Sequence, residues 1–242
     1  MVTSKSGQLT GQSSNMDYRK SVLSIRRNVG LLGIFLPFIL LGWSLSKGCG
    51  ILPSISDYVY SGAAVAFTGI LIAFGIFLLS YPGYPNSKEK ISDNLITSIA
   101  GVLAIITALI PTSWYYLECF IIGSQHDFGL GGLHFVSAAG FFGIMGYMSR
   151  FRFIKGFDDQ VKWTRSKKRR NKWYKALGWV VWVSIAYLIV PTYFEKNYTG
   201  SDVFIGETIA MMAFGTSWLL KGEAMREYSG RFKKLLTVTK DQ

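Results

Sequence analysis

Charged residues are scarce in this sequence. Lys, Arg, Asp and Glu make up 17% of its 242 residues, whereas about 25% is usual for a soluble domain. The deficit falls in long apolar runs, and hydrophobic residues make up 50% of the chain. Acidic residues are fewest, 14 against 26 basic ones. A basic balance is typical of chains that contact nucleic acid or a membrane surface, and the positions of the charges distinguish the two.

Histidine and cysteine are also rare, with two of each. Two histidines exclude a three-histidine metal site, and the sequence has neither an HExxH motif nor a pair of CxxC motifs. We therefore expect no metal and no cofactor. A catalytic metal stays an alternative, because four side chains have suitable ligand chemistry without compact spacing: Asp57, His126, His134 and Glu207.

A long polar segment precedes the first apolar run. Residues 1–28 end in Arg26-Arg27, the run begins near Val29, and no small-residue cleavage site clearly follows it. This pattern differs from that of a cleavable signal peptide. We expect residues 1–28 to form a cytoplasmic tail, mobile in its Ser-, Gln- and Gly-rich part up to Met16.

Six apolar segments approach the length of roughly 20 residues that a helix needs to cross a bilayer of about 30 Å. They comprise residues 29–46, 60–81, 95–114, 130–148, 176–193 and 203–220. The stretch from Gly62 to Leu79 lacks the polar face of period 3.6 that a helix of a soluble bundle normally shows. The sequence therefore predicts an all-α fold, an integral membrane bundle of six transmembrane helices.

The basic residues predict how this bundle is oriented. All but two of the 26 Lys and Arg residues lie in four places: the N-terminal tail, the loop between the second and third predicted helices, the loop between the fourth and fifth, and the C-terminal end with its tail 222–242. Only Lys47 and Lys196 lie on the opposite side. Because Lys and Arg are enriched in cytoplasmic loops, we expect both termini in the cytoplasm.

Both cysteines fall on the outer side in this topology. Cys49 lies between the first two helices, and Cys119 lies between the third and the fourth. That side is oxidising in a periplasm, a lumen or the extracellular space, so we expect a disulfide bond between them. The bond requires Cα atoms within about 7 Å, and the alternative is two unpaired thiols at the membrane interface.

The cytoplasmic loop 149–175 is densely basic and contains the run Lys167, Lys168, Arg169 and Arg170. Similar runs bind nucleic acid or direct nuclear import. This run adjoins an apolar segment, where each basic residue adds about 1 kcal/mol of attraction to anionic lipids. We expect these four side chains to contact lipid headgroups at the cytoplasmic face, and we expect no nucleic acid. A specific phosphoinositide-like site is an alternative.

Polar side chains gather near the outer ends of the predicted helices, whereas the cytoplasmic half shows no comparable cluster within the helices. Polar groups are costly at this depth, so we expect a ligand-binding site open to the outer leaflet. Its candidate residues are Ser56, Asp57, Thr112, His134, Tyr193 and Glu207.

Each candidate also has a structural interpretation. Glu207 must pair, become protonated or face a cavity, and His134 is a candidate partner. The structural alternative for this pair is an interhelical hydrogen bond worth about 0.6 kcal/mol. Asp57 is placed as a helix N-cap would be. Ser56 and His134 have the chemistry of a nucleophile and its base, but no nucleophile-elbow motif accompanies them.

Several short motifs follow one another in an order known from one family. They are ILPSISD at 51–57, SYPGY at 80–84, ALIPT at 108–112, GLHFVSA at 132–138 and ETIA at 207–210. From about Arg26 to Gly222 the chain resembles the Frag1/DRAM/Sfk1 group of six-helix membrane proteins, and most closely the related bacterial DUF998 family. Its densely basic loop departs from DRAM-like proteins.

The resemblance implies a six-helix fold in a bacterial plasma (inner) membrane, with Ser56, Asp57, His134 and Glu207 as site residues. Eukaryotic members are associated with lipid-anchor remodelling, lipid distribution and lysosomal membranes. The favoured function is binding or handling of lipid at an outer-leaflet polar cavity. The alternatives are an intramembrane lipid hydrolase or transferase, and a channel, transporter or oligomeric effector that binds a second copy or another membrane protein.

Overall fold

The computed structural model describes residues 3–83, 90–111, 131–155, 165–194 and 201–238, with side chains in 20–83, 90–111, 131–155, 165–189 and 201–222. Within these ranges the chain is all-helical. The short 3₁₀-helix η1 (Ser56–Tyr60) precedes α2, and a π-helical turn, η2 (Met148–Arg152), continues α4. The six α-helices are α1 (Thr3–Ser46), α2 (Ala64–Leu79), α3 (Asp93–Leu109), α4 (Gly131–Tyr147), α5 (Arg165–Phe194) and α6 (Asp202–Val238).

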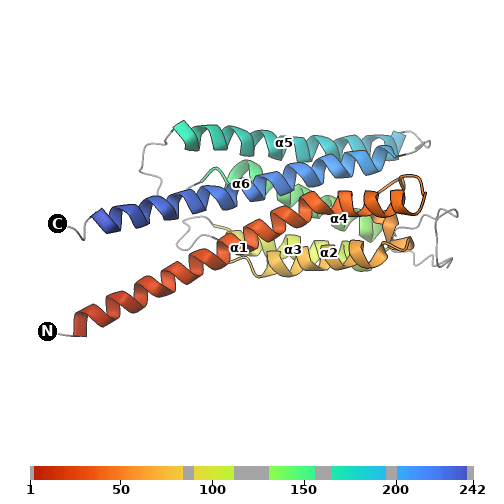
Figure 1. Ribbon diagram of the computed structural model, residues 1–242. Helices are drawn as coiled ribbons and strands as arrows, with labels where there is room; N and C mark the ends of the chain where they lie inside the picture. The colour runs from red at the N-terminus through yellow and green to blue at the C-terminus, as the bar shows by residue number, and fades with distance from the viewer. Residues whose placement is uncertain (1–2, 84–89, 112–130, 156–164, 195–200, 239–242) are drawn as a thin grey trace.

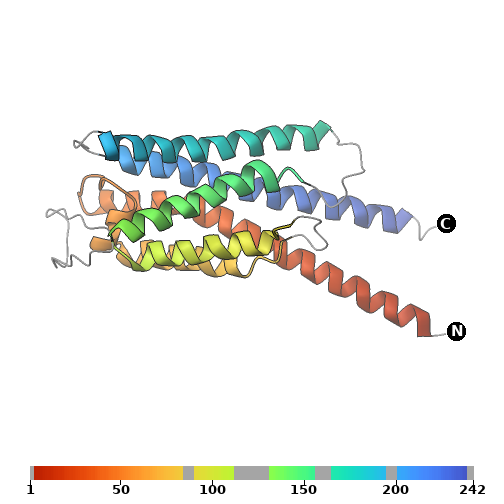
Figure 2. The same cartoon turned by 180° about the vertical axis from the view of Figure 1, so that it is seen from behind.

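The six α-helices lie side by side in one elongated bundle (Figures 1 and 2). Each helix packs against the next one along the chain, and α6 returns to pack against α1, so the helices form a closed ring. Successive helices run in opposite directions, which brings both termini to one end of the bundle (Figure 1). We call this the termini end, and we call the opposite end, where η1 lies, the η1 end.

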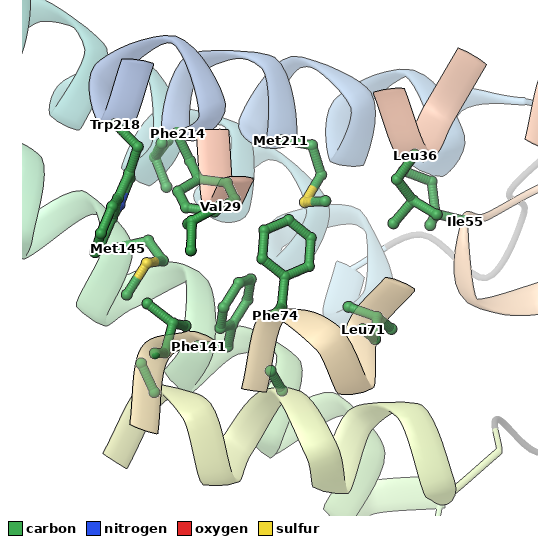
Figure 3. Close-up of a cluster of buried hydrophobic side chains, with 14 of the residues drawn as sticks. Val29, Leu36, Ile55, Leu71, Phe74, Phe141, Met145, Met211, Phe214 and Trp218 are labelled. Carbon is green, nitrogen blue, oxygen red and sulfur yellow. The ribbon is translucent and has the colours of Figure 1, made fainter. Parts of the chain in front are cut away.

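Aromatic and aliphatic side chains fill the centre of the ring (Figure 3). Phe74, Phe141 and Phe214 come from α2, α4 and α6, and their ring centroids lie 5.4, 5.8 and 6.2 Å apart. Such contacts add about 0.5–1.5 kcal/mol each beyond the burial of apolar area. Val29 and Leu36 of α1 are fully buried beside them. All six helices share this hydrophobic core, since its members also include Ala104 of α3 and Val181 of α5.

Glycines allow three pairs of neighbouring helices to approach closely. At five of six positions, a Cβ added to the glycine would lie 2.7–2.9 Å from the carbonyl oxygen of the facing glycine. Real Cβ atoms essentially never come so close, so the backbones can meet only without side chains. Small residues serve helices packed within membranes in the same way. The pairs are Gly30 and Gly215 (α1, α6), Gly75 and Gly101 (α2, α3), and Gly146 and Gly178 (α4, α5).

The all-α prediction is confirmed for the described residues, and each of the six α-helices overlaps one of the six predicted apolar segments. The second helix is shorter than its predicted range of 60–81, because η1 takes up Tyr60 and the chain turns after Leu79. Asn94 helps to hold that turn, since its side-chain amide donates to the Tyr81 carbonyl at 2.8 Å. The third helix ends at Leu109, and residues 112–114 of its predicted range lie outside the described residues.

Three helices extend well beyond their apolar segments. α1 begins at Thr3, α5 begins at Arg165, and α6 ends at Val238. These helices extend into the tails expected at 1–28 and 222–242 and into the loop expected at 149–175, so most of the two tails and the last part of the loop are helical. A helix that has formed gains one backbone hydrogen bond per added residue, and no proline interrupts these polar extensions.

Two helical stretches among the described residues are long and apolar enough to cross a membrane. They are Lys20–Ser46 within α1 and Asp202–Gly222 within α6. The helices Ala64–Leu79 and Asp93–Leu109 are apolar but shorter. Length and composition thus identify two candidate membrane spans. Whether the other four helices also span a membrane depends on which side chains the outer surface of the ring exposes.

Candidate functional site

The residues around η1 lie inside the η1 end of the ring. Tyr58 is fully buried, and its hydroxyl lies 2.8 Å from Ser44 Oγ of α1. Phe204 of α6 donates its backbone N–H to the Pro53 carbonyl at 2.6 Å. The rings of Phe204 and Tyr58 also pack together, with centroids 5.9 Å apart. Residues 53–58, which we call the η1 segment, are therefore held by α1 and α6.

His134 joins the η1 segment to α3 and α4. It lies in the first turn of α4 and is buried. Its Nε2 atom is 2.9 Å from Ser56 Oγ, and its Nδ1 atom is 2.6 Å from the Ile110 carbonyl oxygen. Ile110 follows the last residue of α3, where helix carbonyls lack partners within the helix. One imidazole thus binds the end of α3 and the first residue of η1.

Glu207 of α6 holds the backbone next to Ser56. Its Oε2 atom accepts the N–H of Ile55 at 2.6 Å. Asp57, on the other side of Ser56, is buried in the first turn of η1 and donates its backbone N–H to Ser54 Oγ at 3.1 Å. The carboxyl groups of Asp57 and Glu207 are close enough to interact electrostatically.

A cavity of about 30 Å³ lies beside these groups. Ser56, Thr107 and Glu207 supply the polar part of its wall, and Thr107 Oγ1 lies 2.9 Å from Ser137 Oγ of α4. A cavity of this size holds about one water molecule. The rest of the wall is apolar and includes four residues that are labelled in Figure 3: Leu36, Ile55, Leu71 and Met211.

Four of the six predicted ligand-binding residues meet at the η1 end. They are Ser56, Asp57, His134 and Glu207, which we call the η1-end cluster. The suggested pairing of His134 with Glu207 is corrected, since the described hydrogen bonds of both side chains go to other groups and each holds the η1 segment. Thr112 and the side chain of Tyr193 lie outside the described residues.

Cys49 follows α1 at the η1 end and is disulfide-bonded. The other cysteine of the chain, Cys119, lies outside the described residues. Gly48, the neighbour of Cys49, has a φ of +66°, which glycine adopts at the end of a helix without steric cost. This conformation lets the chain leave α1 towards the η1 segment.

The predicted headgroup contacts Lys167, Lys168, Arg169 and Arg170 lie on the first turns of α5, at the termini end (Figure 1). Lys168 and Arg169 are exposed, whereas Lys167 and Arg170 are half-buried. Arg170 donates to Ser166 Oγ at 2.9 Å. A helix turns by about 100° per residue, so these four side chains do not all point to one side of α5.

A second polar cluster lies at the termini end, where the sequence predicted none. Arg26 of α1, Asp93 of α3, Arg152 of η2 and Lys221 of α6 are buried there, and we call them the termini-end cluster. Arg152 Nε donates to Asp93 Oδ1 at 2.6 Å, and Arg152 Nη2 donates to the Ile91 carbonyl. This ion pair ties the end of α4 to the beginning of α3.

The other two cations of this cluster, Lys221 and Arg26, also bind residues that lie just after helices. Lys221 Nζ donates to the carbonyls of Phe153, at 2.6 Å, and Lys155, at 3.0 Å, both just beyond η2. Cations are favourable at the C-terminal end of a helix, where the dipole is negative. Arg26 Nε donates to the hydroxyl of Tyr81, which follows α2, at 3.1 Å. The described contacts of this cluster therefore fasten the helix ends to one another.

The sequence carried a weak signal for this second cluster. Arg26 and Lys221 directly border apolar runs, but they were counted with the many cations that mark the cytoplasmic side. Hydropathy cannot distinguish a cation that points into the ring from one that points to headgroups.

The described part of the chain contains no group of three or more His, Cys, Asp or Glu side chains that could hold a metal ion.

Neither a protein-family model, a characterised protein nor a solved structure matches this sequence. The resemblance to the Frag1/DRAM/Sfk1 group and the DUF998 family therefore stays a prediction, and the function has to be argued from the site.

Proposed function

We propose that the chain is an integral membrane protein with six membrane-spanning helices. The supporting observation is that all six α-helices expose large apolar side chains on the outside of the ring. Val65 is 84% exposed and Val136 is 68% exposed. Soluble monomers rarely expose apolar patches larger than a few hundred Å², whereas lipid tails accept such a surface. Further examples are Phe35 (α1), Ile76 (α2), Val102 (α3), Phe135 (α4), Val183 (α5) and Ile205 (α6).

The shorter helices are compatible with this proposal. With 16 or 17 residues each, α2, α3 and α4 are about 25 Å long at 1.5 Å per residue. The hydrocarbon core of a bilayer is about 30 Å thick, and local thinning costs only fractions of a kcal/mol per Å. In addition, η2 lengthens α4 and η1 precedes α2. Each of these helices therefore spans most of the apolar layer.

In this proposal the termini end faces the cytoplasm of a bacterium and the η1 end faces outwards. Fusions test the orientation directly, because alkaline phosphatase becomes active only in an oxidising space where its disulfides form. We expect activity from a fusion after Gly50, and none from fusions after Lys155 or Gln242. Green fluorescent protein at the latter two positions should fluoresce. Activity after Lys155 would contradict the topology.

At the cytoplasmic face, we propose that the first turns of α5 contact anionic lipid headgroups. Lys168 and Arg169 are exposed there, and each such charge contributes about 1 kcal/mol near an anionic surface. The half-buried Lys167 and Arg170 contribute through the aliphatic parts of their side chains as well.

At the outer face, we propose that the η1-end cluster binds the polar region of a membrane lipid. The observation that carries this function is the cavity wall, where Ser56 and Glu207 face apolar side chains that suit an acyl chain. At about 30 Å³ the cavity is too small for a headgroup, so binding requires the apolar side chains of its wall to move apart. Side chains such as Leu36, Leu71 and Met211 can change rotamer while the η1 segment keeps its contacts.

Native mass spectrometry of gently extracted protein tests this function. We expect a lipid to accompany the wild-type chain and to bind about tenfold more weakly to Glu207→Ala. The variant loses the proposed hydrogen bond between the Glu207 carboxyl group and the lipid, and about 1.4 kcal/mol corresponds to a factor of ten in affinity. Ser217→Ala is a matched control, because Ser217 is buried away from the cavity wall and donates within α6 to Phe214. Equal lipid occupancy in all three proteins would contradict lipid binding at this cluster.

A further inference from the structure

Ser56 and His134 have the geometry of a nucleophile and its general base. They are separated by 78 residues in the sequence, yet Ser56 Oγ lies 2.9 Å from His134 Nε2. General-base catalysis requires a separation of about 2.6–3.2 Å. Both residues are buried. The first residue of η1 and the first turn of α4 thus place a hydroxyl against an imidazole in a site shielded from water.

The second nitrogen of His134 determines which atom donates. Nδ1 lies 2.6 Å from the Ile110 carbonyl oxygen, and a carbonyl can only accept. Nδ1 therefore carries a proton, and in the neutral ring Nε2 is then the acceptor. Ser56 donates its hydroxyl proton to Nε2 in this arrangement. This is the tautomer in which a histidine can take the proton from an attacking serine.

The backbone on both sides of Ser56 is fixed. Glu207 Oε2 binds the N–H of Ile55, and Ser54 Oγ binds the N–H of Asp57. Farther back, the carbonyl of Pro53 accepts from the N–H of Phe204. These contacts hold Ser56 towards His134 without using the hydroxyl of Ser56. Glu207 is a positioning residue in this arrangement.

The surroundings of Ser56 suit an acyl ester better than a polar substrate. Ser56 lines the cavity, and most of the remaining wall is apolar, including Phe67, Leu71 and Met211. An acyl chain against these side chains would place its ester group near the polar wall. The cavity has room for about one water molecule, which is the co-reactant that hydrolysis requires, and the side chains of its wall must move apart to admit the acyl chain as well.

We propose that Ser56 accepts an acyl group from an ester-linked membrane lipid, with His134 as general base. Ser56 Oγ bonds to the ester carbonyl carbon while its proton passes to Nε2. The bond between the carbonyl carbon and the alcohol oxygen then breaks, and Nε2 gives this proton to the departing alcohol. Water attacks the acyl-serine, gives a proton to Nε2, and releases the fatty acid as Ser56 regains its proton. The proposal rests on lipid binding at the η1-end cluster.

A long-chain alkyl fluorophosphonate tests the proposal on the full chain in native membranes or detergent. This probe forms a stable bond with serines that an adjacent base activates. We expect one adduct, located by peptide sequencing on Ser56. Labelling should disappear in Ser56→Ala and become about 100-fold slower or more in His134→Asn, which removes the general base. Ser217→Ala should be labelled at the wild-type rate.

Peptide mapping of the wild-type protein needs no variant, so a folding defect in Ser56→Ala would not obscure the result. An adduct on another residue, or none at all, would overturn the acyl-transfer proposal. Lipid binding is measured separately on the same samples by native mass spectrometry. Wild-type lipid binding that Glu207→Ala weakens, without a Ser56 adduct, overturns this inference alone. Lipid occupancy that is equal in all variants overturns the proposed function.

Discussion

Replacing Gly215 with leucine is expected to destabilise the protein strongly. A Cβ at this position would lie 2.8 Å from the Gly30 carbonyl oxygen and 3.0 Å from Ile34 Cγ1. The first of these atoms belongs to the backbone of α1 and cannot move aside as the end of a flexible side chain can. The two helices must separate, and overpacking of this kind costs about 3 kcal/mol or more.

The measurement is thermal unfolding in detergent, followed by size-exclusion chromatography. For a chain of this size, about 3 kcal/mol corresponds to a fall in the melting temperature of about 10 °C. Gly42→Leu and Gly69→Leu are matched controls, since a Cβ at Gly42 of α1 or Gly69 of α2 meets no atom within 4 Å. If the melting temperature of Gly215→Leu equals that of these controls, the close approach of α1 and α6 does not stabilise the ring.

The same contrast shows which part of the fold the sequence could predict. Long apolar runs predicted six helices at about the right places, because uninterrupted apolar runs of this length favour helices over strands. Glycines were visible in these runs, but Gly42 and Gly215 look alike in a hydropathy profile. One lies on the open face of its helix and the other at a backbone contact. The neighbours that a residue meets around the helix axis depend on tertiary packing.

The sequence could predict at which end of the bundle the candidate site lies, but it could not predict the hydrogen bonds within the site. The positions of Ser56, His134 and Glu207 along their helices placed them at one end of the bundle, and they do meet there. Their partners are partly backbone groups, namely the N–H of Ile55 and the carbonyl of Ile110. A sequence pattern of side chains cannot predict such partners, because every residue has the same backbone groups.

The helix ends were the least predictable part. Arg165 and Val238 lie in polar stretches where hydropathy falls, yet α5 begins at the first and α6 ends at the second. Hydropathy reports what surrounds a helix, whereas backbone hydrogen bonding determines where it continues. The same limitation hid the termini-end cluster, since Arg152 and Lys221 were interpreted as surface charges.

Removal of Asp93 is the second change for which a large effect is expected. Asp93 Oδ1 lies 2.6 Å from Arg152 Nε, and both side chains are buried. Asp93→Asn takes the negative charge from beside a buried guanidinium, and breaking a buried pair in this way costs about 3–5 kcal/mol. Asp93 also lies in the first turn of α3, where a carboxylate adds about 0.3–1 kcal/mol through the helix dipole.

Asp202→Asn is the matched control, because Asp202 also lies in the first turn of its helix but is exposed. We expect it to change the free energy of unfolding by less than about 1 kcal/mol. Combining Asp93→Asn with Arg152→Met should restore much of the lost stability, since buried pairs are often replaceable by neutral side chains of similar size. If Asp93→Asn melts as Asp202→Asn does, the pair does not stabilise the fold.

The same variants separate stability from function. The Asp93–Arg152 pair joins α3 to the end of α4 at the termini end, whereas His134 lies at the other end of α4. Below its melting temperature, folded Asp93→Asn protein should therefore keep the lipid binding and the Ser56 reactivity that we propose for the wild-type chain. Glu207→Ala should show the reverse pattern, with weaker lipid binding and a smaller change in melting temperature. A loss of lipid binding in folded Asp93→Asn protein would mean that the two ends of the bundle are coupled, with α3 and α4 as the elements that connect them.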